Sequence, residues 1–193
     1  MAADFEVHTL LTPRLELHLV KPLHLLQLAD GEFNNSLLDP LGFSNPHNVL
    51  LEGPSPVRWR APQVREDVTL NRWFIRWIVL KESMEVIGSI SFHGKPNENG
   101  MIEIGLGIVE LFQNQGFATE SLVAMWNWVC TQPGVETLRY TVSPENTPSQ
   151  RIIAKFGFTH MGVQIDDEDG PEDIYEISAR VWRARTANRL FPN

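Results

Sequence analysis

The 193-residue sequence has very little cysteine and no long apolar run. Cys130 is the single cysteine, so no internal disulfide can form, and no Cys/His cluster has the spacing of a zinc site. No stretch approaches the roughly 20 apolar residues of a membrane-spanning helix. The start, MAADFEVHTLL, also lacks the basic and apolar segments of a secretory signal. We therefore expect a soluble protein of the reducing cytoplasm, with neither a membrane nor a metal partner.

Basic residues are in the minority. The sequence has 16 Lys and Arg against 24 Asp and Glu, which gives a formal net charge of −8. A general nucleic-acid binder needs a net basic face to displace phosphate counterions, so the charge argues against nucleic acid and favours amine-bearing partners. The composition is 42% hydrophobic and includes six Trp, enough for one sizeable core, and nothing marks a linker. We expect a single domain over residues 1–193.

Strand-like and helix-like patterns alternate in the first half, which is typical of an α/β fold. Residues 14–20 alternate polar and apolar side chains as a half-buried strand does, and Pro22 suits the first turn of a helix. Five prolines between Gly31 and Pro62 predict loops and short helices there, with no long element. Three strands joined by turn-forming segments then predict an antiparallel meander over residues 72–80, 85–93 and 101–109.

The second half predicts two helices and three strands. Apolar residues recur at helical spacing over 118–129, and residues 137–142 have a strand pattern. A second helix opens at Asn146 and ends at Gly157, a residue suited to a left-handed cap. We expect the last strands at 158–165 and 174–182, joined by the acidic segment 166–173 as a solvated hairpin loop.

A glycine-containing loop, ELFQNQGFATE, occupies residues 110–120 between a predicted strand and a predicted helix. A helix N-terminus has unpaired backbone N–H groups and partial positive charge, so Gly116 and Ala118 would let phosphate oxygens approach the backbone. The loop lacks the Lys-Ser/Thr ending of a Walker loop and the glycine pattern of a dinucleotide fingerprint. These residues alone fit an anion cradle or an ordinary helix entry. We assign the Glu120 carboxylate to the electrostatics of the first helical turn, since it would repel phosphates.

Three segments together resemble the GNAT superfamily of acyl-CoA-dependent N-acetyltransferases. They are IEIGLGI, GFATES and NTPSQRIIAKFGF, and the nearer likeness is to the ribosomal-protein N-terminal acetyltransferase-like branch. The resemblance extends from about Val86 to Phe158. It implies an α/β GNAT fold, which is a mostly antiparallel twisted sheet flanked by helices, with a splayed V between its fourth and fifth strands. It also implies an enzyme that uses acetyl-CoA as acyl donor, without a metal.

The resemblance also implies where coenzyme A binds. In such proteins the pyrophosphate lies on backbone N–H groups of the loop, and the pantetheine arm lies beside the preceding strand as a pseudo-strand. Gly105 and Gly107 would suit a bulge and close backbone approach there; alternatively, they only relieve crowding under the helix. The implied cofactor-binding residues are Leu106, Gly107, Ile108, Val109, Gln113, Asn114, Gln115, Gly116, Phe117, Ala118, Thr119, Asn146 and Ser149.

Acetyl transfer requires a neutral amine, a stabilised oxyanion and a proton for the departing thiolate. Glu103 is the candidate base, opposite the apolar face of its strand; a structural salt bridge is the alternative. Many family members have a Tyr seven positions after the Asn that opens the late helix, but Ile153 stands there. Ser149 matches the Ser of the nearer branch and is the candidate proton donor, with a helix-capping hydroxyl as the alternative. Tyr140, on the preceding predicted strand, is a less favoured candidate for the proton donor.

The replacement of the usual Tyr by Ile153 also suggests a second class of function, a catalytically silent acyl-CoA-binding or regulatory module. The amine acceptor stays open among protein N-termini, small polyamines and aminoglycoside-like compounds. A homodimer stays open as well.

Overall fold

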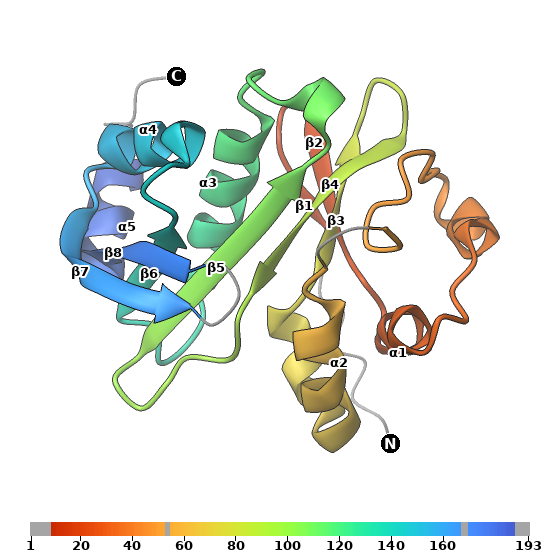
Figure 1. Cartoon of the computed structure of the whole chain (residues 1–193), viewed down its shortest axis with the longest axis horizontal. Helices are drawn as coiled ribbons and strands as arrows, with labels where there is room; N and C mark the ends of the chain where they lie inside the picture. The colour runs from red at the N-terminus through yellow and green to blue at the C-terminus, as the bar shows by residue number, and fades with distance from the viewer. Residues whose placement is uncertain (1–8, 53–54, 167–169, 188–193) are drawn as a thin grey trace. The chain divides into compact units, whose positions relative to one another are not determined.

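The computed structural model describes residues 9–52, 55–166 and 170–187, which alternate between strands and helices (Figure 1). The strands are β1 (Leu10–Leu11), β2 (Leu15–Leu19), β3 (Arg76–Leu80), β4 (Glu85–Phe92), β5 (Met101–Ile108), β6 (Thr137–Val142), β7 (Thr159–Asp166) and β8 (Gly170–Ser178). The α-helices are α1 (Pro22–Asp30), α2 (Val57–Glu66), α3 (Phe117–Val129), α4 (Thr147–Phe156) and α5 (Ala179–Ala187). Short 3-10 helices are η1 (Asn35–Leu41), η2 (Val68–Trp73) and η3 (Glu110–Phe112).

The strands form a mixed sheet in the order β1-β2-β3-β4-β5-β6-β8-β7. Five of the described pairings, β1–β2, β2–β3, β3–β4, β6–β8 and β7–β8, are antiparallel, and β5–β6 is parallel. This arrangement confirms the fold class predicted from the sequence. Within the described residues, no helix combines the length and apolar character needed to cross a bilayer.

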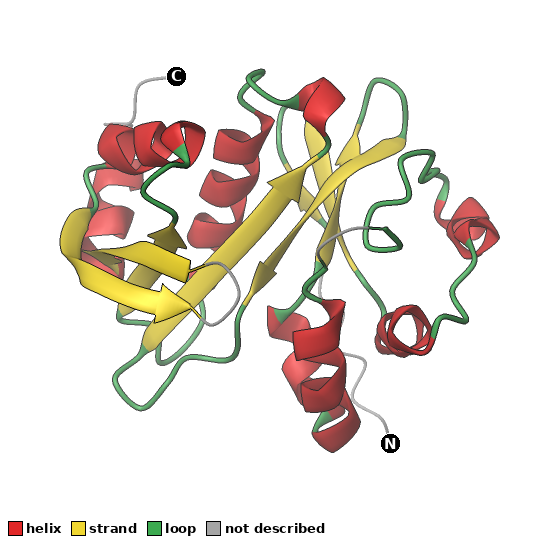
Figure 2. Ribbon diagram, in the orientation of Figure 1, coloured by secondary structure: helices red, strands yellow, loops and turns green. Residues whose placement is uncertain are grey.

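The chain divides into two compact units, and the first comprises residues 1–95 and 106–124. Its strands run antiparallel from β1 to β4, and the end of β5 lies along β4, where Val109 N donates to Ile87 O at 2.9 Å. The described chain between β2 and β3 consists of helices and loops (Figure 2). Fully buried side chains of the core include Leu15, Leu17, Leu25, Phe74, Ile78 and Phe92.

The second unit comprises residues 96–105 and 125–193, and it has an aromatic core. The Trp126 ring lies 4.9 Å from that of Trp182 and 5.0 Å from that of Phe158, measured between centroids. Phe156 and Tyr140 meet the same indole edge-on at 5.7 and 6.1 Å. This packing joins α3, β6, α4 and α5, and it accounts for the helical spacing of apolar residues before Cys130. That thiol is buried, and burial raises its pKa to about 11, as expected of a core cysteine.

Several local predictions are confirmed. Pro22 is the first residue of α1, as predicted, and Gly31, which ends that helix in the left-handed region, was not predicted. Asn146 is the N-cap of α4, and Gly157 ends the helix with φ of 65°. Each end follows from the residue type, because proline has a helix-compatible φ and glycine tolerates positive φ.

One strand boundary predicted in the first unit was wrong. The strand predicted at 72–80 begins only at Arg76, because η2 extends to Trp73 from an Asp67 cap whose carboxylate accepts from Thr69 N. Pro62 also lies inside α2 and does not break it, although the short helices expected in this region are present as η1 and the ten-residue α2. The face of α2 with Val57, Ala61 and Val64 is buried, and this packing outweighs the local preference of proline.

The predicted boundaries near the C-terminus were wrong as well. The segment 166–173 is mostly strand, since β7 ends at Asp166 and β8 begins at Gly170, with Asp166 opposite Gly170. The remaining positions of that predicted loop, 167–169, lie outside the described residues. The strand predicted to reach position 182 ends at Ser178, and α5 follows. Ala179 and Trp182, three residues apart, are both fully buried on one face of α5.

The short strand β1 was not predicted, and it shifts the strand numbers by one. The fourth and fifth strands of the family fold therefore correspond to β5 and β6. Their parallel register runs from Met101 opposite Thr137 to Glu103 opposite Arg139 and ends there, although both strands continue. The predicted V would begin at this point.

Candidate functional site

The loop between β5 and α3 is held by its own amide side chains. Gln113 Nε2 donates to Ile108 O at 2.9 Å, and Gln115 Nε2 donates to Leu111 O at 3.1 Å. Asn114 and Gly116 have positive φ, 60° and 84°, a region that Asn and Gly tolerate best. The loop therefore turns sharply into the first turn of α3.

The first turn of α3 presents unbonded donors. No described residue accepts a hydrogen bond from the N–H groups of Phe117, Ala118 or Thr119, and the first bond of the helix runs from Glu120 N to Gly116 O at 3.0 Å. These donors carry the positive end of the helix dipole. The predicted anion cradle thus has unbonded backbone donors, and the binding of an anion there stays a prediction.

Gly107, near the end of β5, is open on the side where a side chain would project. Among the described residues, no heavy atom lies within 4 Å of the position that its Cβ would occupy. The alternative that this glycine only relieves crowding under the helix is therefore wrong at Gly107. The crowded glycine is Gly88 on β4, whose Cβ would lie 2.3 Å from Gly107 O. Sequence reasoning missed it, and a glycine inside a predicted strand was the available signal.

The Glu120 carboxylate holds Thr12 and Arg14, in the segment before β2, against α3. Thr12 Oγ1 donates to Oε1 at 2.6 Å, Arg14 N donates to Oε1 at 2.9 Å and Arg14 Nε donates to Oε2 at 2.7 Å. Burial alone would raise the pKa of the Glu120 carboxyl, but the hydrogen bonds from Thr12 and Arg14 outweigh it and hold the pKa below its ordinary value. Thr12 and Arg14 were missed, because they lie more than 100 positions from Glu120 along the chain.

The N-terminus of α4, in the second unit, is closed by a side-chain cap. Asn146 Oδ1 accepts from Ser149 N at 3.1 Å. Of the two roles predicted for Asn146, the structure shows the cap, and contact with the cofactor stays a prediction. This cap uses one donor of the first turn of α4.

Ser149 and Tyr140 form a pair of hydroxyl groups. Ser149 Oγ lies 3.3 Å from Tyr140 Oη, which comes from β6, and the cap oxygen belongs to Asn146. The Ser149 hydroxyl therefore does not cap the helix. Burial raises the Tyr140 pKa, against a smaller lowering by the Ser149 hydrogen bond, so the phenol stays protonated at neutral pH. Ile153 is buried in the core and offers no hydroxyl.

Glu103 is a half-buried carboxylate on β5, between the buried Ile102 and Ile104. Its Oε1 accepts from Thr141 Oγ1 at 2.6 Å. Arg139, opposite Glu103 in the register, donates through Nε and Nη2 to Glu176 Oε1 at 2.8 and 2.6 Å. Arg139 is thus paired with Glu176.

The candidate residues fall into two groups. Leu106, Gly107, Ile108 and Val109 end β5, and Gln113 to Thr119 form the loop and first turn of α3, all in the first unit. Glu103, Tyr140, Asn146 and Ser149 belong to the second unit. Among the described residues, no three His, Cys, Asp or Glu side chains gather as metal ligands would.

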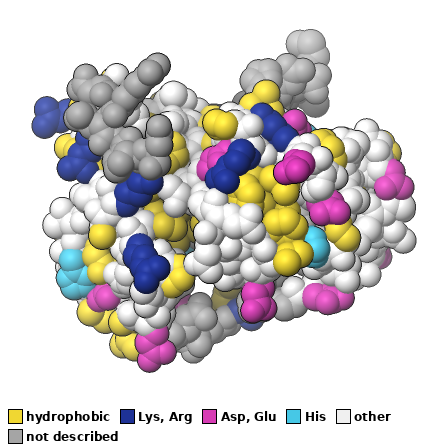
Figure 3. Space-filling model, turned by 90° about the horizontal axis from the view of Figure 1, so that it is seen from above, with side chains coloured by type: hydrophobic (Ala, Val, Ile, Leu, Met, Phe, Trp, Pro, Cys, Tyr) yellow, Lys and Arg dark blue, Asp and Glu magenta, His cyan; other side chains and the backbone are white. Residues whose placement is uncertain are grey.

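Both signs of charge are exposed on the surface. Figure 3 draws one face, on which Lys and Arg side chains occur as well as Asp and Glu side chains.

Comparisons with known proteins point to one family. Residues 50–159, more than half of the chain, match the model of the Acetyltransferase (GNAT) domain. The uncharacterized N-acetyltransferase YjdG of Bacillus subtilis (strain 168) is 32% identical over 101 residues, which are 50% of this chain and 60% of that protein. The chain thus matches less than two thirds of that relative's length.

Solved structures share the fold at low sequence identity. The ribosomal-protein-S5-alanine acetyltransferase from Vibrio fischeri superposes with a TM-score of 0.63 at 17% identity, covering 91% of this chain and 98% of that one. A ribosomal L7/L12 alpha-N-protein acetyltransferase in complex with coenzyme A has a TM-score of 0.58 at 18% identity, covering 89% and 98%.

Proposed function

Since the chain belongs to the GNAT acetyltransferase family, we propose that it transfers an acetyl group from acetyl-CoA to a primary amine. The observation that carries the proposal is the open first turn of α3, where the N–H groups of Phe117, Ala118 and Thr119 have no acceptor among the described residues. Diphosphate oxygens are well-suited acceptors for such a turn.

The residues present fit coenzyme A. Gly116 reaches its φ of 84° without strain and adds no side chain in front of the turn. The open side of Gly107 leaves room for a pantetheine arm beside the end of β5. Acetyl-CoA would supply an activated acetyl thioester and a thiolate leaving group, and no metal is needed for that chemistry.

The hydroxyl pair of Ser149 and Tyr140 is our candidate for the proton that the leaving thiolate takes up. In the proposed step, Ser149 Oγ would donate its proton to the departing sulfur and regain one either from water or from Tyr140 Oη, 3.3 Å away, which solvent would then reprotonate. The Tyr140 side chain is only 4% exposed, so its orientation is fixed by packing. In this assignment, Ser149 takes the role of the Tyr hydroxyl that is missing at position 153.

Glu103 is our candidate for accepting a proton from the incoming ammonium, directly or through water. Its Oε1 accepts a hydrogen bond from Thr141 Oγ1, and this bond orients the carboxylate on β5. Backbone N–H groups near Ile108 are the candidates for stabilising the oxyanion.

Protein N-termini are the first acceptor class to test, with small amines second. The superposed enzymes named for ribosomal proteins share this fold, and the net charge of −8 favours cationic partners. We expect transfer within a ternary complex, in the cytoplasm.

The test measures thiol release from acetyl-CoA with a panel of N-terminal peptides, polyamines and aminoglycosides. Acceptor-dependent release supports the proposed enzyme. Tight binding of coenzyme A without turnover on any amine would instead favour the silent acyl-CoA-binding module. Failure of the protein to bind coenzyme A would overturn both functions.

A further inference from the structure

Arg14, the residue before β2, has its guanidinium fixed against the loop and the first turn of α3. Nε donates to Glu120 Oε2 at 2.7 Å, and Nη1 donates to Gln115 O at 3.0 Å. The guanidinium carbon lies 4.3 Å from the centroid of the Phe117 ring. Contacts with the loop and with the helix on different sides leave the guanidinium little freedom to rotate.

One nitrogen of this guanidinium, Nη2, donates no hydrogen bond to a described residue. The group carries five N–H donors, and these contacts engage only Nε and Nη1. Within the described ranges 9–52, 55–166 and 170–187, no residue accepts a hydrogen bond from Nη2. Nη2 lies 3.4 Å from the position that a Cβ atom at Gly116 would occupy, and the side chain is 46% exposed. A cationic donor therefore stands free beside the glycine of the loop.

The Arg14 guanidinium lies near the positive end of the α3 dipole, where a further anion would be favourable. A cation near a helix N-terminus is repelled by the positive end of the helix dipole. Glu120 offsets that charge, but its oxygens are already engaged by Thr12, the Arg14 backbone and Arg14 Nε.

We propose that Arg14 Nη2 binds a phosphate oxygen of the acyl donor, next to the backbone donors of α3. The proposal rests on the acetyl-CoA-dependent function proposed above. A guanidinium held by two of its donors is prearranged for a phosphate and gives a charge-assisted hydrogen bond. Glu120 and Thr12 are then positioning residues, because they act on acetyl-CoA only through Arg14.

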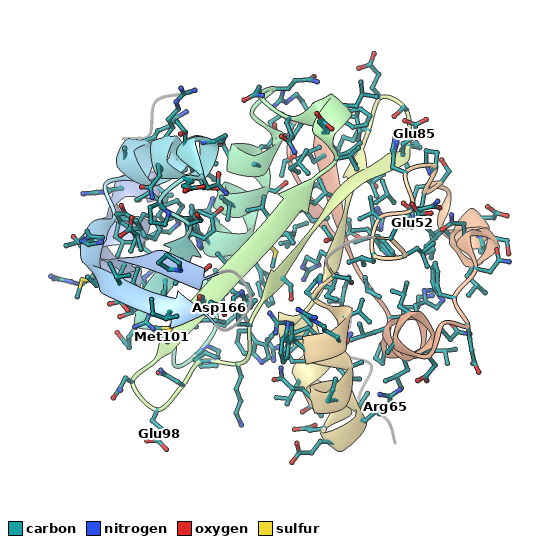
Figure 4. All side chains as sticks on the ribbon, viewed as in Figure 1. Glu52, Arg65, Glu85, Glu98, Met101 and Asp166 are labelled. Carbon is teal, nitrogen blue, oxygen red and sulfur yellow. The ribbon has the colours of Figure 1, made fainter. Side chains whose placement is uncertain are left out.

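The experiment compares Arg14→Gln with Arg65→Gln. Arg65 lies on α2 and pairs with Asp30, and its side chain is 47% exposed, so the control removes an equally exposed, ion-paired arginine away from the loop (Figure 4). Coenzyme A affinity is measured by calorimetry at about 50 and about 500 mM salt, with the thermal midpoint of each protein without ligand. At low salt we expect Arg14→Gln to bind about 10-fold more weakly than wild type, and Arg65→Gln to bind as wild type does.

The salt dependence separates a phosphate contact from a structural one. If Arg14 binds phosphate, the 10-fold difference shrinks at high salt, because ions screen the contact that the variant lacks. A lower thermal midpoint with unchanged affinity well below that midpoint would overturn the proposal, and so would an affinity loss that is equal at both salt concentrations. If wild type itself fails to bind coenzyme A, the proposed function falls too; if wild type binds and Arg14→Gln binds equally well, only Arg14 is excluded.

Discussion

The first turns of α3 and α4 are held in different ways. At α4, Asn146 Oδ1 accepts directly from Ser149 N, so a neutral side chain closes the turn. At α3, Glu120 takes its hydrogen bonds from Thr12 and Arg14, and the N–H groups of the first turn stay unbonded. A cap that uses the donors of its own helix stabilises that helix but blocks an anion, whereas anchoring from outside the helix keeps the donors available. We therefore expect the first turn of α3 to bind a ligand through its backbone, whereas α4 can contribute only side chains.

The largest expected effect comes from blocking the open turn. In Gly116→Val, a branched side chain stands where φ is 84°, in front of the N–H groups of α3. We expect coenzyme A affinity to fall at least about 100-fold, which corresponds to about 2.7 kcal/mol. The thermal shift produced by saturating coenzyme A in wild type should be absent in the variant, because ligand stabilisation follows the affinity.

Backbone strain needs its own control, because valine is unfavourable at positive φ by about 1–3 kcal/mol wherever it stands. Gly31→Val provides it, since Gly31 has φ of 72° at the end of α1 and nothing within 4 Å of its Cβ position. This control should lower the thermal midpoint and still bind coenzyme A. Wild-type affinity in Gly116→Val would remove the loop from the cofactor site.

The second effect belongs to the hydroxyl pair at α4. Ser149→Ala removes the proposed donor and leaves the Asn146 cap intact, because the cap uses the Ser149 backbone. We expect kcat to fall about 10- to 100-fold with little change in coenzyme A affinity, since the lost interaction strengthens only as the sulfur becomes negative. Tyr140→Phe should give a smaller loss. If Ser149→Ala lowers only the thermal midpoint, the proposed reaction has no assigned general acid.

The third effect tests a carboxylate outside both turns. Glu103→Gln keeps the shape of the side chain and removes its basicity, so turnover should fall by about 10-fold where the amine acceptor is protonated. The deficit should shrink as the pH rises toward the pKa of the acceptor, because less substrate then needs deprotonation. The profile of kcat/KM against pH measures this change, and wild-type activity over the whole profile would leave Glu103 a structural role.

The contrast between α3 and α4 was only partly visible in the sequence. The Asn146 cap, the Gly157 end and the loop before α3 follow from residue types a few positions apart, and local chemistry was enough to predict them. Arg14 and Glu120 meet across 106 positions, and the meeting of Tyr140 with Ser149 depends on how β6 packs against α4. Such contacts are set by tertiary packing and have no local pattern.

The boundary at Ser178 shows a further limit of local patterns. Residues 174–182 have apolar side chains that fit a strand, but the last four belong to α5. A pattern over four residues cannot separate a period of 2 from a period of 3.6, and the burial of Trp182 against Trp126 decides for the helix.

The smallest expected effect is on stability, and it compares the two anchors directly. Glu120→Gln should lower the free energy of unfolding at pH 7 by about 1 kcal/mol, because a neutral amide accepts more weakly from Arg14 and Thr12. Asn146→Ala should cost a similar amount, about 1 kcal/mol, by removing the cap of α4. Urea unfolding measures both values.

The pH dependence separates these two losses. The pKa of Glu120 is lower in the folded protein than in the unfolded chain, so its contribution is present above the unfolded pKa and is lost as the pH falls through the folded pKa. The difference between wild type and Glu120→Gln should therefore shrink toward zero in acid. The difference for Asn146→Ala should persist while the protein stays folded, because no proton is taken up at the cap. If Glu120→Gln loses the same free energy of unfolding at every pH, the contacts of Glu120 with Thr12 and Arg14 act by shape and not by charge.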